Sequence, residues 1–79
     1  PSRVTYNNHE YDAVLSNISQ RGAKLLCDAA PKMNSNIVIR TDANQSVAAT
    51  VKWCSRRIIG VEFHRFLSLT ELADWIAKD

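Results

Sequence analysis

The sequence predicts a small, mainly β protein: a six-stranded antiparallel β-barrel followed by one C-terminal α-helix. Six short stretches carry apolar residues at alternate positions, which is the period of a half-buried strand. Turn-forming residues separate them, and a helix-capping sequence occurs only near the end of the chain. Closing six strands into a barrel removes the unpaired edges that an open sheet would expose. We therefore expect the helix to cover an end or a flank of that barrel.

The length and charge of the chain limit the classes of protein to which it can belong. Its 79 residues predict one domain, spanning residues 1–79, with a compact core. Ten Lys and Arg against eight Asp and Glu give a net charge of +2, which is too small for the basic face of a DNA- or RNA-binding protein. A local basic cluster would still suffice for a small anionic ligand. The sequence has no signal-peptide pattern and no apolar run that would span a bilayer, so we expect a cytoplasmic location.

Six segments are predicted to be strands, and short polar turns join most of them. They span residues 3–6, 10–18, 23–27, 36–40, 46–54 and 58–63. Asn7–His9 is expected to turn the chain between the first two, because asparagine tolerates the left-handed backbone of tight turns. One face of the second strand is apolar and carries Tyr11, Ala13 and Leu15. Val14 and Ile18 interrupt its polar face, so we expect that face to be partly covered.

The later strands follow the same alternation. Pro31 lies in the loop after the third strand and ends pairing there, because proline cannot donate to a strand ladder. The fifth strand has the clearest pattern, and one of its faces carries Val47, Ala49, Val51 and Trp53. After a turn at residues 55–57, the sixth strand contains Gly60, which is expected to mark a bend.

A capping box predicts where the helix begins. Ser68 is followed three residues later by Glu71, and this spacing lets each side chain bond to the backbone N–H of the other residue. The helix should run to about Lys78. Four apolar residues recur at helical spacing, namely Leu69, Leu72, Trp75 and Ile76. They predict an amphipathic helix with its apolar face against the core.

Sequence patterns of known enzymes and metal sites are absent from the chain. It has no nucleophile elbow, no metalloprotease His-Glu pair and no glycine-rich phosphate loop, so we expect no enzyme, metal or cofactor. His9 and His64 lack an oriented acidic partner and are expected to be structural. Cys27 and Cys54 are expected to be small buried apolar side chains. Four of the six aromatic residues lie on predicted apolar faces, which argues against binding of single-stranded nucleic acid: Tyr11, Trp53, Phe63 and Trp75.

Small polar residues gather in the turn between the second and third strands. Asn17, Ser19 and Gly22 have the spacing N-x-S-x-x-G. Asn and Ser side chains bond their own backbone in sharp turns, and Gly permits either a positive φ or a close backbone approach. Arg21 in the same turn is either a solvated turn residue or a cation for an anionic ligand.

This turn resembles the second signature of the PilZ domain, a bacterial receptor module for cyclic di-GMP. That signature is Asp or Asn, any residue, Ser, two residues and Gly, very often followed by Ala. Residues Ala49–Trp53 resemble the family's small-x-Val-x-Trp strand, and Ile59–Phe63 resemble its I/V-G-V-E/R-F strand. The resemblance extends from about residue 4 to residue 76 and implies a six-stranded antiparallel barrel with a helix.

The resemblance also implies a ligand and the residues that bind it. Asn17 and Ser19 would contact guanine and phosphate, Gly22 would let the backbone come close, and Arg21 is a candidate cation. PilZ domains that bind cyclic di-GMP also use an R-x-x-x-R arm, which residues 1–79 do not contain, since Arg3 stands alone. Two functions follow: a cyclic di-GMP receptor whose arm arginines come from outside these residues, or a degenerate PilZ domain that has lost nucleotide binding and acts as an adaptor for a protein partner.

Overall fold

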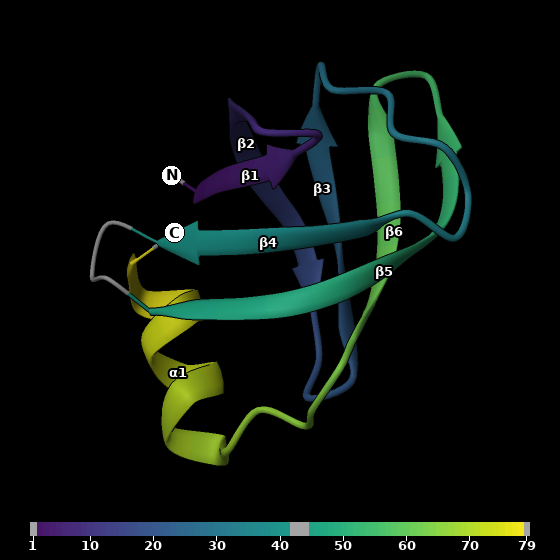
Figure 1. Cartoon of the computed structure of the whole chain (residues 1–79). Coiled ribbons are helices and arrows are strands. Elements are labelled where there is room, and N and C mark those ends of the chain that lie inside the picture. The colour runs from purple at the N-terminus through teal and green to yellow at the C-terminus, as the bar shows by residue number, and fades with distance from the viewer. Residues whose placement is uncertain (1, 42–44, 79) are drawn as a thin grey trace.

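Six antiparallel strands and one helix make up the computed structural model, which describes residues 2–41 and 45–78 (Figure 1). The strands are β1 (Ser2–Tyr6), β2 (His9–Ile18), β3 (Gly22–Cys27), β4 (Asn36–Thr41), β5 (Ser46–Ser55) and β6 (Ile58–Phe63), and the helix is α1 (Leu69–Lys78). They close into a barrel in the order β1-β2-β3-β6-β5-β4. The predicted fold class is therefore confirmed.

Two strand pairs that are not neighbours in sequence close the barrel. β1 pairs with β4 from Ser2 opposite Thr41 to Thr5 opposite Val38. β3 pairs with β6, so that the second hairpin and the last strand lie side by side. Every strand consequently has two partners, and the barrel has no free sheet edge.

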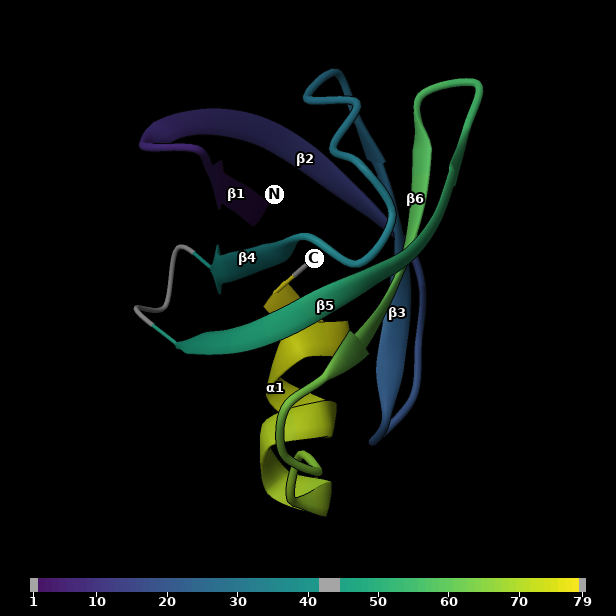
Figure 2. The same cartoon turned by 45° about the vertical axis from the view of Figure 1, so that its right-hand side comes forward.

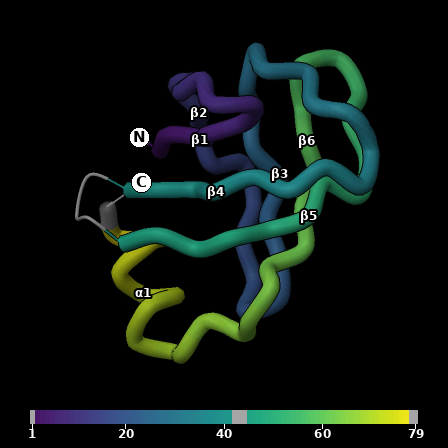
Figure 3. Tube along the Cα trace, in the orientation of Figure 1, coloured from purple at the N-terminus to yellow at the C-terminus, as the bar shows by residue number. Residues whose placement is uncertain are grey.

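Two hairpins turn through left-handed backbone at their tips. Asn7 and Asn8 between β1 and β2 have φ values of 55° and 66°, as expected from asparagine's tolerance of this region. Arg56 and Arg57 between β5 and β6 have φ values of 53° and 70°. Two-residue turns of this kind match the right-handed twist of the strands they join. The β5–β6 hairpin and the 28–35 loop lie at the end of the barrel away from α1 (Figure 3).

Aliphatic side chains from all six strands fill the barrel. The buried apolar residues of the strands are Val4, Ala13, Ala23, Leu25, Cys27, Ile37, Ile39, Val47, Ala49, Val51, Ile59, Val61 and Phe63. The helix α1 lies at one end of the barrel (Figure 2). Leu67 and Trp75 belong to the buried core, and the Trp75 ring centroid lies 6.3 Å from that of Phe63. Trp75 is only 1% exposed, and among the described residues of α1 it is the one that belongs to the buried core, while Leu72 is half-buried.

The helix begins as predicted but buries less than predicted. The Glu71 N–H donates to Ser68 Oγ (3.0 Å), and the Ser68 N–H donates to Glu71 Oε1 (2.9 Å), which confirms the capping box. Leu69 and Ile76 are 72% and 60% exposed, so the prediction of a broad apolar face against the core was wrong. The reason is geometric: α1 meets the end of a narrow barrel, where one indole fills the opening, and does not lie across a sheet.

Two other burial predictions also fail on the outer wall. Cys27 is buried, and burial raises the pKa of its thiol, but Cys54 is exposed where β5 extends beyond the core towards its hairpin. Val14 is 58% exposed, because no element covers the outer face of β2 within the described residues. The polar face of β2 is therefore open to solvent at this position and not partly covered.

The capping carboxylate should make folding stability depend on pH. Arg65 donates to both oxygens of Glu71 (2.9 and 2.8 Å), and with the Ser68 backbone N–H it lowers the pKa of Glu71 from 4.5 to about 2. Protons therefore bind the unfolded chain more tightly than the folded one. The stability that Glu71 contributes should be present above pH 4.5 and lost as the pH falls towards 2.

Urea unfolding of the wild type and of Glu71→Gln measures this contribution. The wild type should be the more stable at pH 7, and the difference should shrink as the pH falls from 4.5 towards 2. Asp74→Asn is a matched control on the same helix, since Asp74 has no arginine partner among the described residues. A difference between wild type and Glu71→Gln that does not change with pH would contradict the expectation.

Candidate functional site

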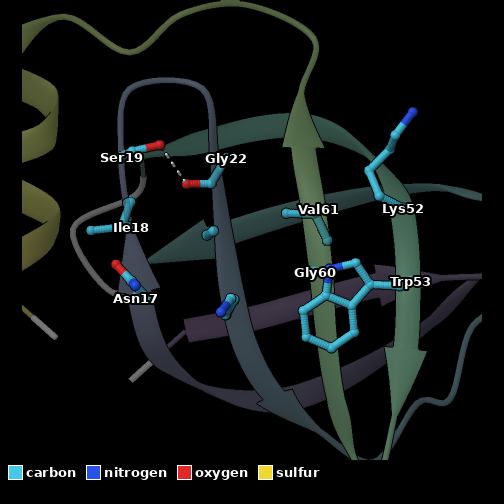
Figure 4. Close-up of a pocket in the computed structure, with 10 residues that line it drawn as sticks. Asn17, Ile18, Ser19, Gly22, Lys52, Trp53, Gly60 and Val61 are labelled. Carbon is cyan, nitrogen blue, oxygen red and sulfur yellow. Dashed lines mark hydrogen bonds between the residues drawn. The ribbon is translucent and has the colours of Figure 1, made fainter.

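A pocket of about 290 Å³ opens on the outer wall of the barrel, over parts of β2, β3, β6 and β5 (Figure 4). Three of the four predicted ligand-binding residues line it, namely Asn17, Ser19 and Gly22. It is also lined by Lys24, Lys52 and Trp53, which were not among the predicted ligand-binding residues. We call this the outer pocket.

One row of residues, taken from four neighbouring strands, runs across the outer pocket. Asn17 on β2 lies opposite Lys24 on β3, Lys24 opposite Gly60 on β6, and Gly60 opposite Trp53 on β5. Residues directly opposite each other in antiparallel strands project from the same face of the sheet. The amide, the ammonium and the indole therefore stand side by side on the outside of the barrel.

A β-bulge in β2 turns Asn17 outwards. Leu15 is opposite Leu25, but Asn17 is opposite Lys24, so Ser16 is an extra residue in the ladder. Strict alternation from the inward-facing Leu15 would direct Asn17 into the core. The extra residue reverses this, because a bulge shifts every following side chain to the other face.

A second bulge in β5 does the same for Trp53. Val51 is opposite Val61 and Trp53 is opposite Gly60, so Lys52 is the extra residue. Trp53 is 40% exposed on the outer wall, so the prediction that it shares the core face with Val51 was wrong. The alternation on which that prediction rested ends at the bulge.

Gly60 provides the surface against which the Trp53 indole packs. A Cβ atom at position 60 would lie 2.2 Å from both Cε2 and Nε1 of Trp53, so only glycine leaves room for the ring there. Gly60 pairs with Lys24 on β3 and with Trp53 on β5, next to the point where the register of β5 and β6 shifts. Lys24 holds its ammonium 5.9 Å from the centroid of the same ring, within the range of a cation–π interaction.

Backbone and side-chain hydrogen bonds fix the turn between β2 and β3. The Ser19 N–H donates to the Gly22 carbonyl (2.9 Å), and the Ser19 hydroxyl donates to the same oxygen over a longer 3.4 Å. The Arg21 N–H donates to Ser19 Oγ (3.3 Å). Gly22 does not have a positive φ, and its Cβ would lie 2.2 Å from the Val61 carbonyl oxygen. Close approach of two strands is thus why glycine is needed here.

Comparison with known protein families gives a match to the PilZ domain over residues 1–78. The chain belongs to the PilZ domain family. Searches of curated proteins and of solved structures returned no match. PilZ domains are binding and regulatory modules of cyclic di-GMP signalling.

Arg21 lies beside the outer pocket of this PilZ domain and does not line it. Its guanidinium carbon is 5.5 Å from the centroid of the Phe66 ring, and its Nη2 is 3.9 Å from Glu62 Oε2. It lines an adjacent hollow of about 300 Å³, together with Phe66 and His64. On the other side of Glu62, Lys52 Nζ lies 3.9 Å from Oε1.

Other polar residues of the PilZ domain lie away from the outer pocket. Arg3, on β1, donates to Glu10 (3.1 Å) and does not line the pocket. His9 and His64 are exposed, and His64 shares a hydrogen bond with the Thr50 hydroxyl (2.8 Å). Over residues 2–41 and 45–78, no three His, Cys, Asp or Glu residues come together as a metal site. In the same ranges, no helix has the length and apolar character that spanning a membrane requires.

Proposed function

We propose that this PilZ domain binds cyclic di-GMP in the outer pocket. One observation carries the proposal. The bulge in β2 and the bulge in β5 turn the Asn17 amide and the Trp53 indole to the outside of the barrel, where both line one pocket beside Lys24. A guanine nucleotide presents a flat aromatic face, a hydrogen-bonding edge and a phosphate. The pocket offers one complementary group for each of these features.

Trp53 supplies the surface for stacking. Its ring is held by Gly60 and Lys24, so little conformational entropy remains to be lost on binding. Asn17 carries both a donor and an acceptor on its amide, which suits the guanine edge with its own donors and acceptors. Lys24 and Lys52 supply positive charge for the phosphates.

Ser19 and Gly22 support the proposal through the turn. The Ser19 hydroxyl makes only a long hydrogen bond of 3.4 Å as a donor, so it can exchange the Gly22 carbonyl for a phosphate oxygen at small cost. The backbone at Gly22 carries no side chain and lines the pocket directly. Residues 1–79 hold no R-x-x-x-R. Lys24 and Lys52 line the pocket, and Arg21 lines the hollow beside it.

Tryptophan fluorescence with calorimetry tests the proposal. Trp75 is buried at 1% exposure, so a change in emission on adding cyclic di-GMP reports on Trp53. We expect quenching that saturates, a matching calorimetric heat, and loss of the quenching in Trp53→Phe. Cyclic di-AMP is the matched control, because it has the same sugar-phosphate ring with a different base edge. No measurable heat at high micromolar cyclic di-GMP would end the proposal.

A second function, an adaptor that binds a protein and no nucleotide, is favoured by one observation. The exposed side of α1 carries apolar Leu69 and Ile76, and Phe66 just before the helix is also exposed. Partner affinity that ignores cyclic di-GMP and falls in Leu69→Ser and Ile76→Ser would support the adaptor. A sub-micromolar affinity for cyclic di-GMP would count against it.

A further inference from the structure

One carboxylate lies between the two cations at the edge of the outer pocket. Glu62 directs Oε2 towards Arg21 and Oε1 towards Lys52, at 3.9 Å in each case. Glu62 is opposite Gly22 in the β3–β6 ladder, so it sits beside the turn that lines the pocket. All three charged side chains are more than half exposed, and such loose surface pairs contribute only about 0.2–1 kcal/mol each. Another anion can therefore replace the carboxylate at small cost.

We propose that Glu62 competes with a ligand phosphate for Arg21 and Lys52 and thereby sets the affinity of the outer pocket. This inference rests on the proposed function. A phosphodiester presents two non-bridging oxygens, which correspond to the two carboxylate oxygens that now face the two cations. The carboxylate and the phosphate are alternatives, because two anions between the same cations repel each other.

Phe66, which does not line the outer pocket, gives Arg21 a second contact. The guanidinium carbon lies 5.5 Å from the ring centroid, so Arg21 is held by Phe66 and Glu62 together. Lys52 already lines the pocket, and Glu62 is its carboxylate partner. Neutralising Glu62 therefore frees Lys52 for a phosphate and leaves Arg21 with only the ring contact.

Calorimetric titration of Glu62→Gln with cyclic di-GMP tests the competition. Gln has nearly the same shape as Glu and occupies an exposed strand position, so the fold should be unchanged. We expect Glu62→Gln to bind roughly 3- to 10-fold more tightly than the wild type, since two weak pairs are no longer disrupted. Asp12→Asn is the matched control: it removes the same charge from an exposed site five residues before Asn17 on β2, and it should change the affinity less than 2-fold, within roughly 0.4 kcal/mol.

Two further variants test whether Glu62→Gln raises the affinity through Arg21 and Lys52. The gain from Glu62→Gln should be smaller in an Arg21→Gln or a Lys52→Gln background than in the wild type. A gain of equal size in both backgrounds would overturn the competition. If the wild type binds cyclic di-GMP and Glu62→Gln raises the affinity no more than Asp12→Asn does, the competition is overturned and the proposed function stands. Failure of both wild type and Glu62→Gln to bind would overturn the two proposals together.

Discussion

Replacing Trp53 with alanine is expected to weaken cyclic di-GMP binding by roughly 10- to 100-fold, because stacking of one base on an aromatic ring contributes about 1–3 kcal/mol. The indole already lies against β6 at Gly60, with Lys24 beside it, so its loss removes a preformed surface. Calorimetry measures the change in affinity. Trp53→Phe, which keeps a smaller ring, should fall between the wild type and the alanine variant.

The same substitution should leave the barrel folded. Trp53 lies on the outer wall, outside the set of buried core residues, so the free energy of unfolding should fall by less than about 1 kcal/mol. Met33→Ala is a matched control, since it removes an exposed apolar side chain from the 28–35 loop. Its affinity should equal that of the wild type. Equal affinities for Trp53→Ala and Met33→Ala would show that no base stacks on the indole.

The position of Trp53 shows where reading the sequence by alternation stops being reliable. Alternation placed Trp53 on the core face with Val51, and the alternation holds as far as Val51. One extra residue, Lys52, then reverses the face, and no feature of the side chains marks it as the bulge. The same holds for Ser16 before Asn17. A bulge is defined by the partner strand, and that partner is identified only when the barrel closes.

Features that depend on local chemistry were predicted well. The Asn7 and Asn8 turn, the capping box at Ser68 and the N-x-S-x-x-G turn all depend on residues within five positions of each other. Features that depend on distant contacts were not. The number of apolar helix residues that pack against the core was overestimated. The barrel end accommodates little more than Trp75, and the width of that opening depends on all six strands. The two lysines of the outer pocket were missed because only the closed barrel brings Lys24 on β3 and Lys52 on β5 to one pocket.

Gly60 indicated a close contact within the sheet, but the sequence alone did not identify Trp53 as the residue that makes it. A glycine inside a strand can mark either a bend or close approach by another group, and only the bend was predicted at Gly60. Pairing it with Trp53 requires the β5–β6 register, which includes the bulge. The glycine and the tryptophan are best understood as one unit, in which the absent side chain of the first makes room for the ring of the second.

Gly22→Ala is expected to lower both the free energy of unfolding and the affinity for cyclic di-GMP. The new Cβ would lie 2.2 Å from the Val61 carbonyl oxygen and 3.4 Å from Glu62 Cα, both backbone atoms of β6. Backbone cannot rotate away as a side chain does, so β3 and β6 must separate at this end. We expect a loss near the upper end of the roughly 1–3 kcal/mol typical of overpacking. This is a large part of the roughly 4–12 kcal/mol expected for a domain of 79 residues.

The other glycine of the chain supplies the matched control, because Gly60→Ala adds the same methyl group two rows along the same pair of strands. Its Cβ would meet the Trp53 ring, and a side chain on the outer wall can be displaced more easily than the β6 backbone, so the free energy of unfolding should fall by less than in Gly22→Ala. Urea unfolding of both variants measures this order. In a Trp53→Ala background the steric penalty of Gly60→Ala should vanish, whereas that of Gly22→Ala should remain. Equal losses of the free energy of unfolding in the two variants would mean that the β6 backbone at Val61 moves as readily as the indole. The close strand contact would then not explain why position 22 is glycine.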